Sequence, residues 1–260
     1  MYFDTHTHLD DRAFDQDRTA LIERLRQNGV DHIIAVAADE AGCRNAVALA
    51  EQYDFIYAAV GYHPDAAQRM NEDDLKSIKA LAAHPKVVAI GEIGLDYHWP
   101  EDTDKAAQME WFARQMALAE TLGKPVSIHS RDATADTLDI LRSFPAVRGV
   151  LHCFSGSVDT MRQVIDMGYY IALGGVVTFK NARKTKEVAA AVPEERLLLE
   201  TDCPYLAPEP LRGKRNDPGT LCYIARAIAE LRGTSAEHIA RVTNENAHRL
   251  FLDAEKKQVG

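Results

Sequence analysis

The residues of this chain best suited to chemistry are histidines and carboxylates that end apolar runs. The first pair, His6 and His8, lies in the stretch Tyr2-Phe3-Asp4-Thr5-His6-Thr7-His8-Leu9-Asp10. Residues two apart on a strand point to the same face, so both imidazoles would face one point. Neutral imidazoles are common ligands of divalent metals, although two surface histidines near a terminus are the plain alternative. Asp4 shares that strand face and would either orient His6 or lie as a polar residue at a barrel floor.

Four further residues of metal-binding type end later apolar runs: Glu92, His129, His152 and Asp202. Of the ten histidines, five fall at run ends, namely His6, His8, His63, His129 and His152. We expect the other five at exposed helix or loop positions: His32, His84, His98, His238 and His248. A structural histidine is the simpler reading of any one site, but the whole set predicts a metal centre with the ligands His6, His8, Glu92, His129, His152 and Asp202.

This predicted ligand set is too large for one tetrahedral ion with an open position, and suits two divalent ions about 3.5–4 Å apart. We expect Glu92 to bridge the ions. His6, His8 and Asp202 would hold one ion, and His129 and His152 the other. Mixed nitrogen and oxygen ligands favour Zn, Mn, Co or Fe over Mg. Such a centre activates water for hydrolysis, so we predict Asp202 and Glu92 as catalytic residues, with Asp202 taking the proton from water.

The predicted ligands are positioned by a pattern of strand then helix that occurs eight times. The predicted strands lie in 2–10, 32–37, 55–61, 87–91, 125–128, 149–151, 169–173 and 196–199, and the clearest helix covers 104–122. Parallel strands joined by helices form either an open doubly wound sheet or a closed barrel. The chain length and the lack of a Gly-rich loop after the first strand favour an α/β TIM (β/α)8 barrel, with residues 1–260 as a single domain. Strand carboxyl ends meet at one face of such a barrel.

Composition limits the class of protein. The chain is 46% hydrophobic and 27% charged, with a net charge of −9, which excludes a general nucleic-acid-coating protein but not a nuclease with a local cationic site. There is no apolar run of membrane-spanning length and no signal peptide pattern at the start, so we expect a cytoplasmic protein without membrane contact, and a monomer. The cysteines show no C-x-x-C spacing, which argues against disulfides and a zinc ribbon.

Substrate contacts are expected from the loops at the strand ends. His63 precedes a proline and would donate a hydrogen bond to substrate, with structural packing as the alternative. Arg131 follows His129 by two residues and would face an anion. The loop Arg212-Gly213-Lys214-Arg215-Asn216 follows the last strand, so Arg215 and Asn216 are predicted to bind substrate, with a solvated loop as the alternative.

Several blocks of the chain, spread over nearly its whole length and in the family's order, resemble the signature motifs of the TatD family. They are Phe3-Asp4-Thr5-His6-Thr7-His8-Leu9-Asp10, Gly91-Glu92-Ile93-Gly94-Leu95-Asp96-Tyr97, Pro125-Val126-Ser127-Ile128-His129-Ser130-Arg131-Asp132, His152-Cys153-Phe154-Ser155-Gly156 and Leu199-Glu200-Thr201-Asp202-Cys203-Pro204-Tyr205. The loop Arg215-Asn216-Asp217-Pro218 carries Asp217 where the family has Glu. The resemblance implies a metal-dependent hydrolase of the amidohydrolase superfamily on a TIM barrel, with the six ligands named above. It also implies that Glu92 stands where related phosphotriesterases carry a carboxylated lysine.

Three functions are compatible with these residues. The first, which the resemblance implies, is a deoxyribonuclease that cleaves phosphodiester bonds of DNA, with single strands or ends as substrate. The second is hydrolysis of a small ester, lactone or amide. The third is a metal-bound binding or regulatory protein without turnover. A basic groove with aromatic rings would favour the first, and the residues expected to supply the rings are Tyr62, Tyr97, Trp99 and Phe154.

Overall fold

The strands of the described residues, 1–99 and 104–253 of a computed structural model, form one parallel sheet in sequence order. They are β1 (Tyr2–Thr7), β2 (Val30–Val36), β3 (Ile56–Val60), β4 (Val87–Asp96), β5 (Val126–Arg131), β6 (Gly149–Leu151), β7 (Tyr170–Leu173) and β8 (Leu197–Leu199). Each strand pairs in parallel with the next, as helical crossovers between strands require. The predicted TIM barrel is confirmed.

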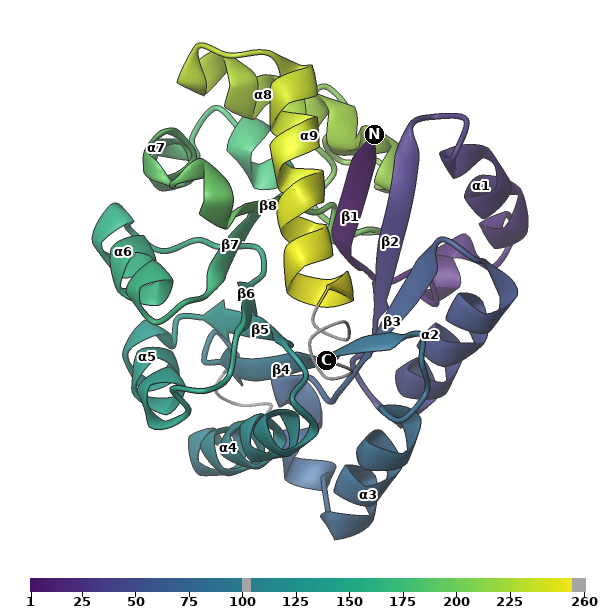
Figure 1. Cartoon of the computed structure of the whole chain (residues 1–260), viewed down its shortest axis with the longest axis vertical. Coiled ribbons are helices and arrows are strands. Elements are labelled where there is room, and N and C mark those ends of the chain that lie inside the picture. The colour runs from purple at the N-terminus through teal and green to yellow at the C-terminus, as the bar shows by residue number, and fades with distance from the viewer. Residues whose placement is uncertain (100–103, 254–260) are drawn as a thin grey trace.

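Most of the helices surround the sheet on its outer side, and the last of them, α9, lies across one end of the barrel (Figure 1). The helices are α1 (Arg18–Leu25), α2 (Glu40–Gln52), α3 (Glu72–Leu81), α4 (Lys105–Leu122), α5 (Thr134–Ser143), α6 (Val158–Asp166), α7 (Arg183–Ala191), α8 (Leu221–Arg232) and α9 (Ala236–Ala247). Shorter turns are η1 (Arg12–Phe14), η2 (Pro64–Arg69), η3 (Gly175–Thr178), η4 (Glu194–Arg196), η5 (Pro218–Thr220) and the π-helical η6 (His248–Leu252). Within the described residues, no helix has the length and apolar character that a membrane span requires.

Local sequence signals explain the helix ends. The carboxylate of Asp104 accepts a hydrogen bond from Ala107 N at the start of α4, and Gly123 ends that helix with φ 63°, a left-handed conformation that glycine adopts without strain. The Ser235 hydroxyl accepts a hydrogen bond from His238 N at the start of α9. These caps fix where each helix begins, and therefore how long each crossover is.

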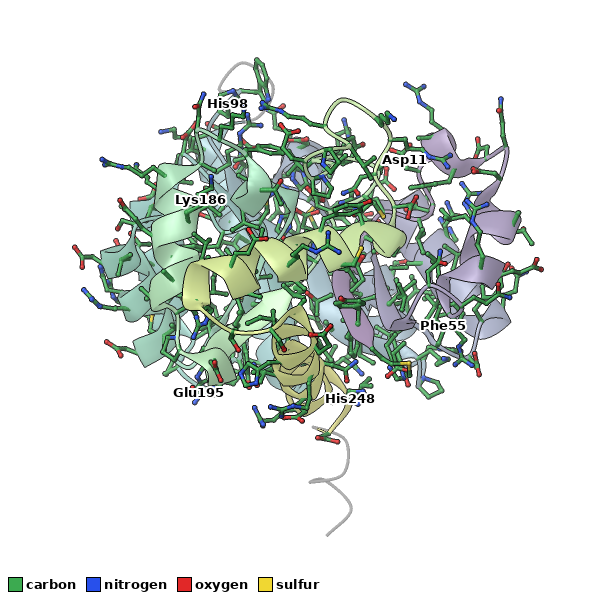
Figure 2. All side chains as sticks on the ribbon, turned by 90° about the horizontal axis from the view of Figure 1, so that it is seen from above. Asp11, Phe55, His98, Lys186, Glu195 and His248 are labelled. Atoms are coloured by element: carbon green, nitrogen blue, oxygen red, sulfur yellow. The ribbon has the colours of Figure 1, made fainter. Side chains whose placement is uncertain are left out.

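The barrel interior is filled by small and branched side chains, and one end is closed by the last helices. Its cluster of buried residues combines strand side chains with Ala247, Leu250 and Phe251 of α9 and η6. Figure 2 shows the two ends of the barrel: Asp11 and His98, which follow β1 and β4, lie at one end, and His248 lies at the other. The end marked by Asp11 and His98 is therefore free of these closing helices.

Bonds between β1 and the segment after β8 close the barrel. The buried carboxylate of Asp4 accepts hydrogen bonds from Thr201 N at 2.9 Å and Thr201 Oγ1 at 2.6 Å. Beyond it, Asp202 N donates to His6 O and His8 N donates to Cys203 O, at 3.0 and 2.8 Å. The side chain of Asp4 thus fastens β1 to the 201–203 segment and makes no contact with the His6 ring among the bonds observed. Of its two predicted roles, the geometry supports the structural one.

Replacing Asp4 by alanine should lower the free energy of unfolding by about 2–4 kcal/mol, because two buried donors of Thr201 would lose their acceptor. Chelator-treated protein should be unfolded in urea, so that metal binding does not contribute. Asp139→Ala is the matched control, since Asp139 is 73% exposed and pairs only with a neighbour on its own helix. Equal stability of the two variants would show that Asp4 does not hold the barrel closed.

Several strand bounds differ from those expected; β5, for example, continues to Arg131 instead of ending at 128. His32 does not lie at an exposed helix or loop position; it lies in β2, with its side chain 20% exposed. The strand predicted to stop before Glu92 continues to Asp96. Gly94 permits this extension, because its φ of +146° is unsuited to other residues and an added Cβ would lie 2.0 Å from His129 O. The close approach of β4 to β5 brings Glu92 and Asp96 to His129.

Candidate metal centre

Glu92 lies at the middle of a cluster of histidines. Its Oε2 is 3.4 Å from His6 Nε2 and 3.6 Å from His8 Nε2. Its Oε1 is 2.9 Å from His129 Nδ1 and 2.8 Å from His152 Nε2. The two oxygens of one buried carboxylate therefore face two separate pairs of imidazoles.

Asp202 lies beside the first of these pairs, His6 and His8. Its Oδ1 is 3.4 Å from His8 Nε2 and 4.0 Å from His6 Nε2. The residue follows β8 with φ 56°, a left-handed conformation that is strained for a non-glycine residue and that often marks functional positions. The structure thus brings together all six residues predicted as ligands. His6 also has a ligand atom within 4.8 Å of one from His152, so the geometry does not separate the two expected sets.

The donor set fits divalent metals. Among the described residues, four sets of three side chains at this centre each offer ligand atoms within 4.8 Å of one another. They are His6 with His8 and Glu92, His6 with His152 and Asp202, Glu92 with His129 and His152, and His63 with Asp96 and His129. Imidazole nitrogens and carboxylate oxygens in such groups match zinc, manganese, cobalt or iron. The predicted role of the six residues as ligands therefore has a geometry that permits it.

Electrostatics keep the carboxylates of this centre charged. Burial disfavours the charged form of Glu92, but His152, His6 and the other nearby imidazoles hold its pKa well below the usual range. Burial likewise opposes ionisation of Asp202, yet its hydrogen bond with His8 lowers its pKa. Burial lowers the pKa of His6 to about 4, so that imidazole is neutral at pH 7. Anionic oxygens and a neutral imidazole are the forms that bind metals. Burial would lower the pKa of His8, but Asp202 and Glu92 raise it to about 9, so metal binding there would release a proton.

Partners behind the histidines are the residues that the sequence analysis missed. Asp96 Oδ2 lies 3.0 Å from His129 Nε2, on the side of the ring away from Glu92. Burial would lower the pKa of His129, but Asp96 and Glu92 raise it to about 10. Ser127 Oγ lies 3.2 Å from His6 Nδ1. A partner on the second ring nitrogen fixes the orientation and tautomer of a ligand histidine.

Glu200 is a second overlooked carboxylate. It is fully buried, accepts a hydrogen bond from Cys153 N, and lies 3.8 Å from His152 Nδ1. Burial and the charge of Asp202 raise its pKa well above the usual range. Its Oε2 and His152 Nδ1 are both buried, and neither has a hydrogen-bond partner among residues 1–99 and 104–253. Glu200 stands two residues before Asp202 in the same motif, and this position was the sequence signal that could have identified it as part of the site.

Asp96→Asn should weaken metal binding about 10–100-fold, the usual cost of losing a partner behind a ligand histidine. The variant is conservative, because an asparagine oxygen can still accept the hydrogen bond from His98 N that Asp96 accepts now. Competition with a fluorescent zinc chelator would give the affinity. Asp132→Asn, which alters a carboxylate paired with His98 nearby, is the control. Unchanged affinity in Asp96→Asn would remove Asp96 from the centre.

Two of the predicted substrate residues lie at the centre. His63 Nε2 is 3.9 Å from Glu92 Oε1, and its Nδ1 accepts a hydrogen bond from Asp65 N. Nδ1 also lies 3.2 Å from Asp65 Oδ2, so this side of the ring faces Asp65 and Nε2 faces the cluster. Arg131 ends β5 and lines the same pocket. Contact of either residue with substrate stays a prediction.

The other two predicted substrate residues are not brought to the pocket. Arg215 donates two hydrogen bonds of 2.7 Å to the carboxylate of Asp17 and lies over the Phe14 ring. Asn216 is fully buried, and its Nδ2 donates to the carbonyls of Thr201 and Tyr205. The cause is a set of partners distant in sequence, which hold this loop against α1 and the 201–205 turn. Their placement gives no support to a substrate contact.

A pocket of about 480 Å³ opens over the cluster. Trp99 and Tyr205 line it with exposed fractions of 55% and 54%, so their rings are available for contact. Trp99 was among the rings expected there, and Tyr205 was not. Tyr62, Tyr97 and Phe154 are not among the residues that line the pocket, and Tyr62 and Phe154 are buried. The other residues that line the pocket include several carboxylates, among them Asp10, Asp11, Asp39 and Asp65. The pocket therefore combines aromatic rings, one arginine and a strongly acidic floor.

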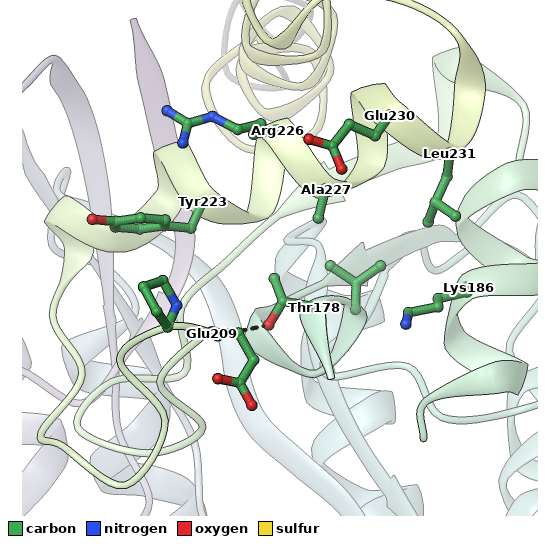
Figure 3. A pocket seen from close by; sticks show the side chains of 10 residues that line it. Thr178, Lys186, Glu209, Tyr223, Arg226, Ala227, Glu230 and Leu231 are labelled. Carbon is green, nitrogen blue, oxygen red and sulfur yellow. Dashed lines mark hydrogen bonds between the residues drawn. The ribbon is translucent and has the colours of Figure 1, made fainter. Parts of the chain in front are cut away.

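A different pocket, of about 560 Å³, lies between η3, α7, α8 and the segment of Glu209 (Figure 3). The Glu209 backbone N–H donates to Thr178 Oγ1 at 2.8 Å, which joins the segment to η3. Lys186, Arg226 and Glu230 are among its lining residues, but none of the lining residues belongs to the metal-capable groups among the described residues. The pocket over Glu92 is the better site for metal-assisted hydrolysis.

Comparison with known proteins agrees with this geometry. A model of the family described as TatD related DNase matches residues 3–252. The uncharacterized metal-dependent hydrolase YabD of Bacillus subtilis is 50% identical over 253 residues, which cover 96% of this chain and 99% of that protein. A protein of Musicola paradisiaca named 3'-5' ssDNA/RNA exonuclease TatD is 36% identical, over 98% of this chain and 99% of its own length. The crystal structure of YjjV, a TatD homologue from Escherichia coli, matches with a TM-score of 0.89 at 33% identity, over 96% of this chain and 97% of that one.

Proposed function

The chain belongs to the TatD related DNase family of metal-dependent hydrolases, and we propose that it is a deoxyribonuclease that hydrolyses phosphodiester bonds at the ends of single-stranded DNA. The observation that carries the proposal is the Glu92 carboxylate placed between two pairs of imidazoles at the floor of a pocket with exposed rings. The similar protein named as a single-strand exonuclease supports the choice of substrate.

We propose that two divalent ions bind at this carboxylate. Glu92 would contact both, His6, His8 and Asp202 would hold one, and His129 and His152 the other. Bound ions supply Lewis acidity and lower the pKa of water at the site. Asp202 is ionised at neutral pH and would accept the proton of the attacking water.

The remaining residues of the pocket would orient the substrate. His63 Nε2 would donate a hydrogen bond to a phosphate oxygen, and the guanidinium of Arg131 would pair with the phosphate. Trp99 and Tyr205 would stack on the terminal bases, an interaction that tolerates any base sequence. Single strands fit this arrangement better than duplexes, because only unpaired bases expose their faces to the rings.

The acidic floor gives the proposal a specific consequence. Asp10, Asp11, Asp39 and Asp65 line the pocket together with Glu92 and Asp202, and repel a phosphate in the absence of cations. The divalent ions should therefore be required for DNA binding as well as for catalysis. This differs from a nuclease that binds through a basic surface, and agrees with the net charge of −9.

End-labelled single-stranded and duplex DNA should be incubated with metal-loaded protein, beside a panel of esters and lactones. The His6→Ala/His8→Ala variant is the control for contaminating nuclease. We expect stepwise, metal-dependent shortening of single strands and an increased KM in Arg131→Ala. Cleavage of esters or lactones without DNA cleavage would assign the alternative hydrolase function, and no turnover of any substrate would favour a non-catalytic metal-binding protein.

A further inference from the structure

A second cluster of metal-ligating side chains lies at the opposite end of the barrel from Glu92. Asp31 and His32 are near the start of β2, and His248 begins η6 directly after α9. Figure 2 shows His248 at the end of the molecule away from Asp11 and His98. The cluster joins the second strand to the last helical segment and shares no residue with the metal centre.

The three side chains present their ligand atoms to one point. One ligand atom from each lies within 4.8 Å of the others, and all three residues are partly buried. His32 Nδ1 is shielded from solvent and has no hydrogen-bond partner in the described part of the chain, although Asp31 Oδ2 is 3.3 Å away. The rings of His32 and His248 meet edge to face, with centroids 4.8 Å apart at 86°. The shielded nitrogen lies beside a carboxylate and a second imidazole. Together these three groups are ligands of the kind that bind a metal cation.

Packing holds the imidazoles in place. Phe3 lies 5.3 Å from the His32 ring centroid and 5.6 Å from that of His248, and Tyr57 lies 5.8 Å from His32. Ligand side chains fixed in this way lose little conformational entropy when an ion binds. Burial and the neighbouring His248 act together to lower the pKa of His32, although Asp31 opposes them. His32 is therefore neutral at pH 7, the form that binds metals.

We propose that Asp31, His32 and His248 bind a divalent first-row transition metal, with zinc as the representative ion. Two imidazoles and one carboxylate supply three ligands, and water would complete a tetrahedral shell. Magnesium and calcium are disfavoured, because they prefer oxygen ligands. Such an ion would join the start of β2 to the end of α9, and would stabilise the closure of this end of the barrel by the C-terminal helices.

The proposal is independent of the hydrolytic function, and the experiment separates the two sites. Elemental analysis after dialysis against zinc should give one ion fewer per chain in His248→Ala than in the natural sequence. His32→Gln and Asp31→Asn should show the same loss, so the result does not depend on the folding of one variant. His238→Ala is the matched control, because His238 lies on α9 and pairs with Glu194 outside the cluster; it should keep all its zinc.

A thermal measurement tests the proposed link to stability. In the His6→Ala/His8→Ala background, which weakens the centre, zinc at 100-fold above its Kd should raise Tm by about 5–10 °C through the second site. Adding His248→Ala should remove that rise. If all variants bind the same number of ions, and zinc raises Tm equally with and without His248, the proposed site does not exist.

Discussion

Replacing Glu92 by glutamine is expected to reduce turnover about 10³-fold or more and to leave the protein with fewer bound ions. The reason is geometric. Glu92 faces His6 and His8 with one oxygen and His129 and His152 with the other, so it is the group that both proposed ions would share. Losing the transition-state stabilisation of a bound ion costs several kcal/mol, and about 4 kcal/mol corresponds to 10³-fold.

Glutamine keeps the shape of the side chain but carries no charge, so the variant tests charge rather than packing. Elemental analysis should count the ions, circular dichroism should show an intact fold, and kcat should be measured at saturating metal. Glu209→Gln is the control, because Glu209 lies outside the centre in the pocket of Figure 3. A Glu92→Gln protein with a full set of ions and normal turnover would contradict both the bridging role and the proposed mechanism.

Much of the fold and part of the site could be predicted because their signals are local. The apolar runs before His129 and His152 mark buried strands, and a barrel places all strand ends at one face. The convergence of His6 with Asp202 then follows from closure, which Asp4 and Thr201 provide through side-chain bonds. Periodicity and residue type are therefore sufficient to predict the strands, the barrel and the face at which the predicted ligands meet.

The partners behind the ligands could not be predicted, because they depend on strand register. Asp96 reaches His129 only because β4 extends past Glu92 and pairs Gly94 with His129. Nothing in the apolar pattern shows that extension, which Gly94 permits. The orientation of Arg215 depends likewise on Asp17, a partner far away in the sequence. Long-range pairs of charged residues therefore set the limit of the prediction.

Asp202→Asn is expected to keep the fold and the bound ions but to lower kcat about 10²–10⁴-fold, the range that general base catalysis provides. Asparagine can still offer an oxygen toward His8, which lies 3.4 Å from Asp202 Oδ1, so metal binding should change less than turnover. Burial opposes the charge of Asp202 and its hydrogen bond with His8 favours it, with a lowered pKa as the result. The natural side chain is thus ready to accept a proton at pH 7, and an amide is not.

The proposed base is distinguished from a ligand alone by two measurements on Asp202→Asn. If Asp202 takes the proton from water, kcat should fall at saturating metal while the ion count stays unchanged. The defect should also be as large for a nitrophenyl phosphodiester as for DNA, because a good leaving group gives no help to the attacking water. Asp159→Asn, which alters a carboxylate on α6 that is 85% exposed, serves as the control. A fall in kcat that more metal restores would show that Asp202 serves only to hold the ion, and recovery with the activated substrate would place its proton transfer at the leaving group.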